Sequence, residues 1–335
     1  MITPPFAPAP FPLARPRRLR ASPWVRRLVA ENTVTPADLI WPLIVHDGAD
    51  DRVAVPSMPG VFRLSPKAAA EAAKEARDLG IPVVALFPNV DPATKDAVGT
   101  GATDPDGLVP DCIKAIKDVA PEIGVMCDVA LDCHTDHGHD GVIENGRIAN
   151  DATLERLAEQ AFIQAHAGAD VVAPSDMMDG RVQAIREALE ANGFQDTLIL
   201  SYAAKYASAF YGPYRDAVGS AKMLTGDKKT YQMDFANSDE ALREVAMDIA
   251  EGADAVMVKP GMPYLDIIRR VSETFGVPTF AYQVSGEYSM MQAAIANGWL
   301  DEDRAIVETL TAFKRAGCAG VLSYFAPKAA RLLGS

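Results

Sequence analysis

Two lysines end apolar segments, where a charged side chain is unusual. Lys205 closes the segment LILSYAAK (198–205), and Lys259 lies near the end of AVMVKP (255–260). On adjacent strands of a parallel sheet, which lie roughly 4.8 Å apart, both amines would reach one small ligand. Burial and like-charge repulsion each favour a neutral amine, and a neutral amine attacks a ketone to form a Schiff base. The pair therefore predicts Schiff-base chemistry, although either lysine alone could extend to solvent or pair with a carboxylate.

A stretch rich in carboxylates and imidazoles follows a third apolar segment. It reads DVALDCHTDHGHDG (128–141) and contains Asp128, Asp132, Asp136, Asp140, His134, His137 and His139. Such a mixture suggests a metal site, which leaves a metal-dependent hydrolase as an alternative function. The stretch lacks H-E-x-x-H and any pair of cysteines at zinc spacing. We therefore expect the three histidines to lie in a solvated loop, and Asp128 and Asp132 to share one face of a strand.

Eight apolar segments alternate with amphipathic stretches along most of the chain. They cover residues 39–45, 82–87, 124–131, 170–175, 198–205, 255–260, 279–285 and 320–325. Continuous apolar runs are typical of parallel strands that are buried on both faces. Eight strand-then-helix units predict an α/β protein with a (β/α)8 TIM barrel, whose active site lies at the carboxyl ends of the strands. Lys205 and Lys259 would end the fifth and sixth strands at that site.

The helical stretches between these segments have identifiable ends. In the stretch 65–80, Ser65 occupies the N-cap, Pro66 the first helical position and Gly80 the position after the last turn. The phrases AGAD, EGAD and AGCAG each end a helix shortly before a strand, and their glycines suit a left-handed C-cap. Since no inner linker interrupts the pattern, we predict one barrel domain over residues 36–335.

Charge is distributed unevenly along the chain. The first 27 residues contain six arginines, seven prolines and no acidic residue. The remainder carries 26 basic and 45 acidic residues, a net charge of −19, which argues against nucleic acid as a partner. So many prolines exclude a helical transit peptide. We predict that residues 1–35 form an extended arm that docks on an acidic neighbouring subunit, with a disordered tail as the alternative.

Composition also bears on the cellular compartment. No apolar run reaches 18 residues, so we expect no membrane span, and the N-terminus lacks the apolar core of a secretory signal. The four cysteines, Cys112, Cys127, Cys133 and Cys318, show no C-x-x-C spacing. These features favour a reducing, cytoplasmic compartment.

Four segments of the chain together resemble the porphobilinogen synthase family, also called 5-aminolaevulinate dehydratase. They are SYAAKYASAFYGPYRDA, MVKPGMPYLD, AYQVSGEY and DVALD followed by HGHDG. The resemblance extends from about residue 13 to the C-terminus. It implies a barrel lyase that condenses two 5-aminolaevulinate molecules into porphobilinogen with loss of two waters, a step of tetrapyrrole (haem and chlorophyll) biosynthesis.

The resemblance also implies roles for individual residues. Lys259 matches the lysine that forms a Schiff base with the P-side substrate, and Lys205 matches the lysine that binds the A-side substrate. The remaining matches are carboxylate-binding groups: Arg215, Lys228 and Gln232 on the A side, Ser285 and Tyr324 on the P side. We also expect Ser175 and Tyr211 to contact substrate. Asp128, Asp132 or the second lysine would remove the proton that bond formation requires.

The resemblance bears on metals and assembly too. Zinc-dependent members have cysteines where this chain has Ala130, Asp132 and Asp140, and carboxylates without thiolates suit zinc poorly. We therefore predict no catalytic zinc and no organic cofactor, with Asp132 and Asp140 binding the A-side amino group alongside Asp128. Glu244 matches a glutamate of magnesium-stimulated members, which predicts an allosteric Mg²⁺ held mostly through water; a metal-independent enzyme is the alternative. Family members assemble through their arms, so we expect a homo-oligomer, an octamer or else a hexamer.

A class I aldolase-like lyase on the same fold is the closest alternative function. Such an enzyme needs a single lysine and a phosphate-binding glycine loop after the seventh or eighth strand. The sequence shows two lysines and no such loop.

Overall fold

A computed structural model of the chain describes residues 9–219, 224 and 226–334, and it divides into two compact units, Met1–Thr33 and Val34–Ser335. The described part of the first unit contains a 3-10 helix, η1 (Pro16–Arg20), and a short helix, α1 (Pro23–Leu28). Its exposed large apolar side chains among the described residues are Phe11, Leu13, Leu19, Trp24, Leu28 and Val29. The predicted arm, 1–35, includes this unit, and residues 1–8 lie outside the described residues.

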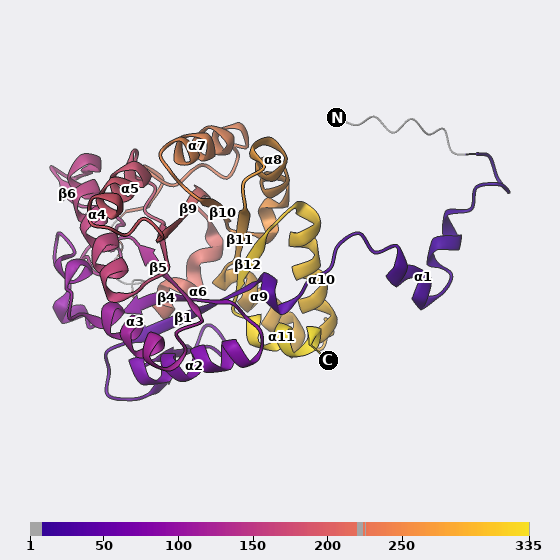
Figure 1. Cartoon of the computed structure of the whole chain (residues 1–335), viewed down its shortest axis with the longest axis horizontal. Coiled ribbons are helices and arrows are strands. Elements are labelled where there is room, and N and C mark those ends of the chain that lie inside the picture. The colour runs from indigo at the N-terminus through magenta and orange to yellow at the C-terminus, as the bar shows by residue number, and fades with distance from the viewer. Residues whose placement is uncertain (1–8, 220–223, 225, 335) are drawn as a thin grey trace. The chain divides into compact units, whose positions relative to one another are not determined.

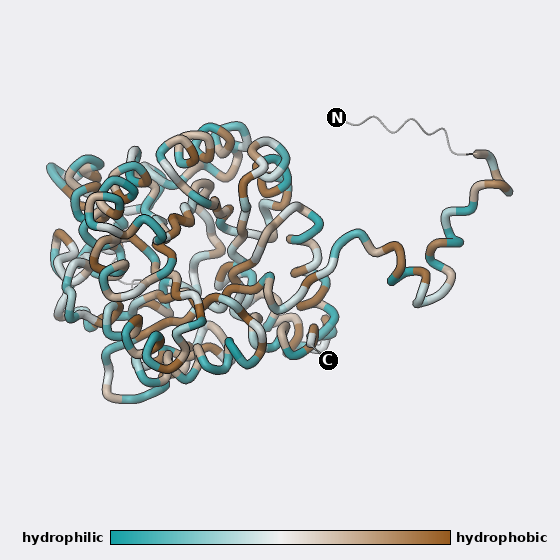
Figure 2. The backbone as a smooth tube through the Cα atoms, in the orientation of Figure 1, coloured by the Kyte–Doolittle hydropathy of each residue, from teal (hydrophilic) through white to brown (hydrophobic). Residues whose placement is uncertain are grey.

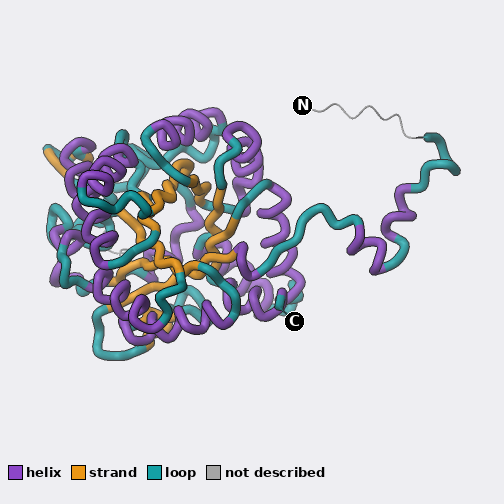
Figure 3. The backbone as a smooth tube through the Cα atoms, in the orientation of Figure 1, coloured by secondary structure: helices purple, strands orange, loops and turns teal. Residues whose placement is uncertain are grey.

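The second unit is built around a closed barrel of eight parallel strands, which Figures 1 and 3 show inside a ring of helices. The strands are β1 (Leu39–His46), β4 (Val83–Asn89), β5 (Gly124–Val129), β8 (Val171–Pro174), β9 (Leu198–Lys205), β10 (Ala255–Lys259), β11 (Thr279–Gln283) and β12 (Gly320–Ser323). Each strand pairs with the next in this order, and β12 pairs with β1 at Leu39 and Val321 to close the ring. The predicted (β/α)8 TIM barrel is confirmed.

Burial on both faces explains why the strands read as unbroken apolar runs. Every residue of β8 and β12 is buried, and so is all of β9 except Leu198. In Figure 2 the hydrophobic colour gathers along these inner strands. A parallel barrel covers one face of each strand with helices and the other with the packed interior, so no polar alternation is needed.

The helices follow their strands in regular order, and their ends match the predicted caps. They are α2 (Pro66–Asp78), α3 (Leu108–Val119), α4 (Asn150–Ala167), α5 (Arg181–Ala191), α6 (Gly212–Ala217), α7 (Asp239–Ala250), α8 (Leu265–Phe275), α9 (Ser285–Ala296), α10 (Glu302–Ala316) and α11 (Ala326–Leu333). The Ser65 hydroxyl accepts the Ala68 amide at 3.2 Å, which caps α2. Gly168 and Gly317 adopt φ of +109° and +106° and end α4 and α10.

Short elements complete the fold and were not predicted. Strands β2 (Arg52–Ala54) and β3 (Phe62–Leu64) extend the barrel sheet beside β1, while β6 (Ile143–Glu144) and β7 (Arg147–Ile148) form a separate hairpin. The other 3-10 helices are η2 (Pro36–Asp38), η3 (Pro92–Thr94), η4 (Thr100–Thr103), η5 (Ala209–Tyr211) and η6 (Met262–Tyr264). Among the described residues, no helix has both the length and the apolar character needed to span a membrane.

Candidate active site

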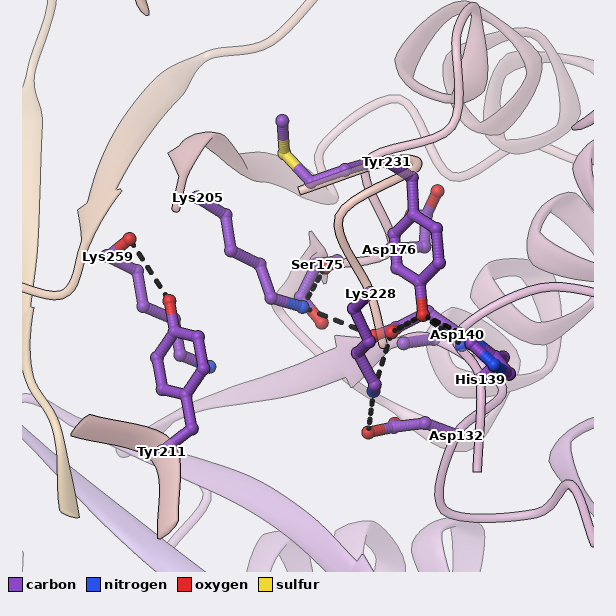
Figure 4. Close-up of polar contacts among 12 residues, drawn as sticks. Asp132, His139, Asp140, Ser175, Asp176, Lys205, Tyr211, Lys228, Tyr231 and Lys259 are labelled. Atoms are coloured by element: carbon purple, nitrogen blue, oxygen red, sulfur yellow. Dashed lines mark hydrogen bonds and ion pairs between the residues drawn. The ribbon is translucent and has the colours of Figure 1, made fainter. Parts of the chain in front are cut away.

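The two predicted lysines lie side by side at the carboxyl ends of neighbouring strands. Lys205 is the last residue of β9 and Lys259 the last residue of β10, and the two are partners in the parallel register. Both side chains are buried, with 5% of each residue exposed. Figure 4 shows the two side chains projecting into the same region. The barrel thus brings together two amines that are 54 residues apart in sequence, as predicted.

Lys205 is held by oxygen atoms. Its Nζ donates to Asp140 Oδ1 at 3.2 Å and to the carbonyl oxygen of Ser175. Ser175 directly follows β8, so its carbonyl points to the same end of the barrel. The contact with Asp140 is a buried ion pair, and an amine in such a pair must lose a proton before it attacks a carbonyl.

Lys259 has a contrasting environment made of aromatic rings. Its Nζ lies 4.9 Å from the ring centres of Tyr202 and Tyr282, 5.3 Å from Tyr214 and 5.5 Å from Tyr211. Burial, followed by the charge of Lys205, lowers the pKa of Lys259 to about 7. A substantial fraction of this amine is therefore neutral near pH 7, which is what nucleophilic attack requires.

Asp140 is the centre of a buried charge cluster. Its Oδ2 lies 2.7 Å from Lys228 Nζ and accepts the Tyr231 hydroxyl at 2.9 Å, while Lys228 also donates to Asp132 at 3.1 Å. Although burial opposes ionisation, Lys205 and Lys228 hold the pKa of Asp140 well below its usual range. Two ammonium groups thus balance the carboxylates of Asp132 and Asp140.

Asp128 is buried near both lysines, but none of the described lysines or arginines lies within ion-pair distance of it. Burial raises the pKa of Asp128 to about 6, against the opposing effect of Lys259 and Lys205. Its Oδ1 is buried and has no hydrogen-bond partner among the described residues. The predicted strand 124–131 ends at Val129, so Asp128 lies on β5 but Asp132 and Asp140 lie in the following loop. The prediction that Asp128 and Asp132 share one face of a strand is therefore wrong.

Most of the predicted substrate-contacting residues line one small cavity. Its walls are Asp132, Lys205, Tyr211, Tyr214, Arg215, Lys228, Gln232 and Lys259. The Tyr211 hydroxyl donates to the Lys259 carbonyl oxygen at 3.2 Å. Arg215 and Lys228 add two cations to this lining besides Lys205 and Lys259. Cations in this position would stabilise a carboxylate of a ligand.

The predicted P-side groups occupy two further positions. Ser285 is the first residue of α9, and its hydroxyl accepts the Tyr214 amide at 2.8 Å. Tyr324 follows β12, and its hydroxyl lies 2.9 Å from the hydroxyl of Tyr282. Tyr324 lines a neighbouring cavity of about 270 Å³ and reaches the surroundings of Lys259 through Tyr282.

The prediction of a solvated histidine loop is wrong for two of its three histidines. His134 and His139 are buried, each with 6% of its surface exposed, and only His137 is partly exposed. The loop folds back on itself, with the Leu131 amide bonded to the Asp140 carbonyl oxygen at 3.2 Å. Burial lowers the pKa of His134 to about 4, so its ring is neutral at pH 7. The polar residue types of this loop do not indicate that its histidines are buried.

Glu244 lies apart from the lysine pair. It is half-buried on α7 and lines a cavity of about 850 Å³, together with Asp179 and Glu240. Burial raises the pKa of Glu244, and the charges of Asp248, Asp179 and Glu240 act in the same direction against Arg181. Within the described part of the chain, no group of three or more His, Cys, Asp or Glu side chains is arranged to hold a metal.

Several residues of the site were not predicted. Tyr231 contacts Asp140, His139 contacts Tyr231, and the rings of Tyr202, Tyr214 and Tyr282 surround Lys259. The available signal was proximity in sequence to predicted site residues. Tyr231 precedes Gln232, Tyr202 lies within the segment that ends at Lys205, and Tyr214 precedes Arg215. Spacing alone does not say which tyrosines point inward.

Comparisons of sequence and structure find known proteins that are similar to this chain. Residues 13–332 match the family model described as delta-aminolevulinic acid dehydratase. The Bradyrhizobium diazoefficiens protein named delta-aminolevulinic acid dehydratase is 63% identical, covering 95% of this chain and 90% of its own. The Rhodobacter capsulatus protein of that name is 55% identical, covering 100% and 99%. A Toxoplasma gondii delta-aminolevulinic acid dehydratase (porphobilinogen synthase), solved with the reaction product porphobilinogen, superposes with a TM-score of 0.93 at 50% identity and covers 95% and 91%.

Proposed function

Because the chain belongs to the delta-aminolevulinic acid dehydratase family, we propose that its lysine pair joins two 5-aminolaevulinate molecules into porphobilinogen. The predicted identity as a porphobilinogen synthase, a lyase, is confirmed by this membership, and the aldolase-like and metal-hydrolase alternatives are not favoured. The observation that carries the proposed mechanism is the register pairing of two buried lysines with opposite surroundings.

Lys259 takes the first substrate because its amine is the more readily neutral. It attacks the ketone carbon, and loss of one water leaves an imine that draws electrons from the adjacent carbon. The surrounding tyrosine rings stabilise the cationic imine through their faces, as they stabilise the ammonium. Ser285, and Tyr324 acting through Tyr282, hold the carboxylate of this P-side substrate.

Lys205 takes the second substrate after it passes its proton to a neighbouring base. Arg215, Lys228 and Gln232 bind the A-side carboxylate, and Asp132 and Asp140 bind the A-side ammonium. Ser175 and Tyr211 keep the two lysines in place through the contacts described above. Loss of a second water forms the second imine, and both lysines are released as amines once the carbon–carbon and carbon–nitrogen bonds form.

Asp128 fits the proton-abstracting base better than Asp132. Its pKa near 6 leaves it ionised yet basic at pH 7, and its free Oδ1 can accept a proton. Asp132 is paired with Lys228 and is less available.

Glu244 offers one carboxylate for a hydrated Mg²⁺. The crowded carboxylates around it make a divalent cation favourable, and a single protein ligand with several waters suits magnesium. At the lysine site the corresponding residues are Ala130 and the carboxylates of Asp132 and Asp140, without a thiolate, which disfavours zinc. The chemistry proposed above requires no organic cofactor.

The arm joins copies of this chain into an oligomer, an octamer or else a hexamer. Its support is the exposed apolar set that includes Trp24 and Leu28, flanked by arginines that suit the acidic barrel unit. Deleting residues 1–33 should lower the number of subunits per particle measured by light scattering. An unchanged number of subunits would exclude a role of the arm in assembly. The four cysteines are buried and unpaired, which supports a cytoplasmic location.

Product formation tests the function directly. The full chain should convert 5-aminolaevulinate into a pyrrole that gives a coloured adduct with an acidic aldehyde reagent, with EDTA and added Mg²⁺ run in parallel. Lys259→Met and Lys205→Met should each abolish the pyrrole, while Lys74→Met, at a surface lysine of α2, should not. Pyrrole formation by either site variant at the wild-type rate would exclude the lysine-pair mechanism.

A further inference from the structure

The phenol of Tyr231 lies between the Asp140 carboxylate and a second buried ring. Its oxygen is 2.9 Å from Asp140 Oδ2 and 3.0 Å from His139 Nδ1, and the Asp140 amide donates to it at 3.4 Å. We propose that His139 and Tyr231 are positioning residues that fix Asp140 against Lys205 and thereby control capture of the A-side substrate. This inference rests on the proposed function.

The direction of each hydrogen bond follows from the charge on Asp140. Since Lys205 and Lys228 keep Asp140 ionised, its oxygens only accept, and the single proton of Tyr231 must point to Oδ2. Burial and the charge of Asp140 raise the pKa of Tyr231, so the phenol keeps that proton. The phenol oxygen then accepts from its other neighbours, and His139 carries a proton on Nδ1. A directed chain therefore runs from His139 through Tyr231 to Asp140.

Tyr231 belongs to the same segment as two predicted A-side groups. A turn joins them, because the amides of Tyr231 and Gln232 both bond to the Lys228 carbonyl oxygen, at 3.3 and 2.9 Å. The next residue, Met233, donates its amide to the carbonyl oxygen of Lys205 at 3.0 Å. The segment is thus fixed to the Lys205 backbone at one point and to Asp140 at another.

Lys259 lies outside this network. The aromatic rings over its Nζ are the four tyrosine rings described above, and neither His139 nor Tyr231 is among them. The Asp140 carboxylate instead contacts Lys205 and Lys228. Loosening Asp140 should therefore impair the A-side site while leaving the P-side site nearly intact.

Measuring the adduct on each lysine separately tests whether His139 and Tyr231 position Asp140. Borohydride reduction in the presence of 5-aminolaevulinate, followed by peptide mass mapping, reports the adducts on Lys205 and Lys259 of the full chain. Tyr231→Phe removes only the hydroxyl and keeps the ring contact with His139. It should reduce the Lys205 adduct and turnover by roughly 10- to 100-fold, as expected for one hydrogen bond to a charged group. The Lys259 adduct should stay within about twofold of wild type.

A second pair of variants separates positioning from packing. His139→Asn keeps an N–H donor close to the position of Nδ1 and should retain most of the Lys205 adduct, whereas His139→Leu should lose it as Tyr231→Phe does. Thermal melting identifies any variant that fails to fold, and the remaining variants then decide the question. Equal loss of both adducts would overturn the proposed positioning role. So would a wild-type amount of Lys205 adduct in both Tyr231→Phe and His139→Leu. If wild type traps neither lysine, the proposed lysine-pair mechanism itself fails.

Discussion

Lys205 and Lys259 are register partners on adjacent strands, yet only Lys205 contacts a carboxylate. Asp140 lies 3.2 Å from Lys205 Nζ, whereas no acidic side chain within the described residues comes within ion-pair distance of Lys259. One backbone geometry thus presents two amines in opposite surroundings, one beside a carboxylate and one among tyrosine rings. Under the proposed mechanism, this asymmetry predicts an order of binding in which Lys259 reacts first.

Imine formation on Lys259 should depend on pH with a midpoint near 7. The amine must be neutral to attack, so the rate should rise as pH increases through the pKa of about 7 and then level off. The charge of Asp128 raises that pKa, so Asp128→Asn should move the midpoint to lower pH, by roughly one unit. Single-turnover trapping across a pH series measures the midpoint.

The matched control is Asp136→Asn, which removes an exposed carboxylate of the same loop and should leave the midpoint unchanged. Asp128→Asn should still form the imine. It should form pyrrole more slowly, because the variant lacks the proposed proton-abstracting base. A midpoint that does not move, or moves upward, would contradict the placement of Asp128 beside Lys259.

Replacing Lys259 should stabilise the folded protein near neutral pH. Its pKa falls from 10.5 to about 7 on folding, so between these values the unfolded chain binds the extra proton and the free energy of unfolding rises with pH. Lys259→Met removes this dependence. The variant should be more stable than wild type at pH 7, by about 4 kcal/mol, with the difference shrinking toward pH 10. Urea unfolding at both pH values tests this, and a variant less stable at pH 7 would refute it.

A buried ion pair should contribute strongly to stability. Arg181 on α5 bonds to Asp248 on α7, with one N–O distance of 2.8 Å, and the Ser201 hydroxyl of β9 donates to the same carboxylate at 2.6 Å. Asp248→Ala leaves the buried Arg181 charge with only the more distant carboxylate of Asp176, at 4.0 Å, and should cost about 3–5 kcal/mol in urea unfolding.

The comparison is Glu273→Ala, which breaks the exposed pair with Arg269 on α8. That change should alter the free energy of unfolding by less than about 1 kcal/mol. Equal effects for the two alanine variants would show that burial does not set the strength of these pairs.

Magnesium binding should depend on Glu244. Wild type is expected to show a concentration-dependent rise in melting temperature with Mg²⁺, and Glu244→Gln should abolish it because the neutral amide is a poor ligand for a hard cation. Glu308→Gln on α10 removes a carboxylate from a different face and should keep the response. A wild-type protein with no Mg²⁺ response would favour a metal-independent enzyme.

The barrel could be predicted because its signals are local. Each buried strand is an unbroken apolar run, and Ser65, Gly168 and Gly317 mark helix ends by their own side chain or backbone freedom. The short strands β2 and β3 lack such a run, since Phe62 is exposed and Arg63 uses its guanidinium to hold the carbonyl oxygens of Asp216 and Ala217. Such strands depend on tertiary contacts that a local pattern does not contain.

The site was predictable only in part for the same reason. The lysine pair followed from strand ends, but the contact between Asp140 and Lys205 joins residues 65 positions apart, across a loop of irregular structure. The burial of His134 and His139 also arises from the folded loop, and not from the polar residues that compose it. The positions of strand ends can be predicted from local sequence patterns, whereas the conformation of this loop cannot.

The measurement that tests the lysine pair most directly is borohydride trapping on the wild-type protein with 5-aminolaevulinate, read by peptide mass mapping at limiting and saturating substrate. At limiting substrate the adduct should appear on Lys259, and at saturating substrate it should appear on Lys205 as well. Adducts confined to other lysines, or a complete absence of adducts while pyrrole still forms, would contradict the lysine-pair mechanism.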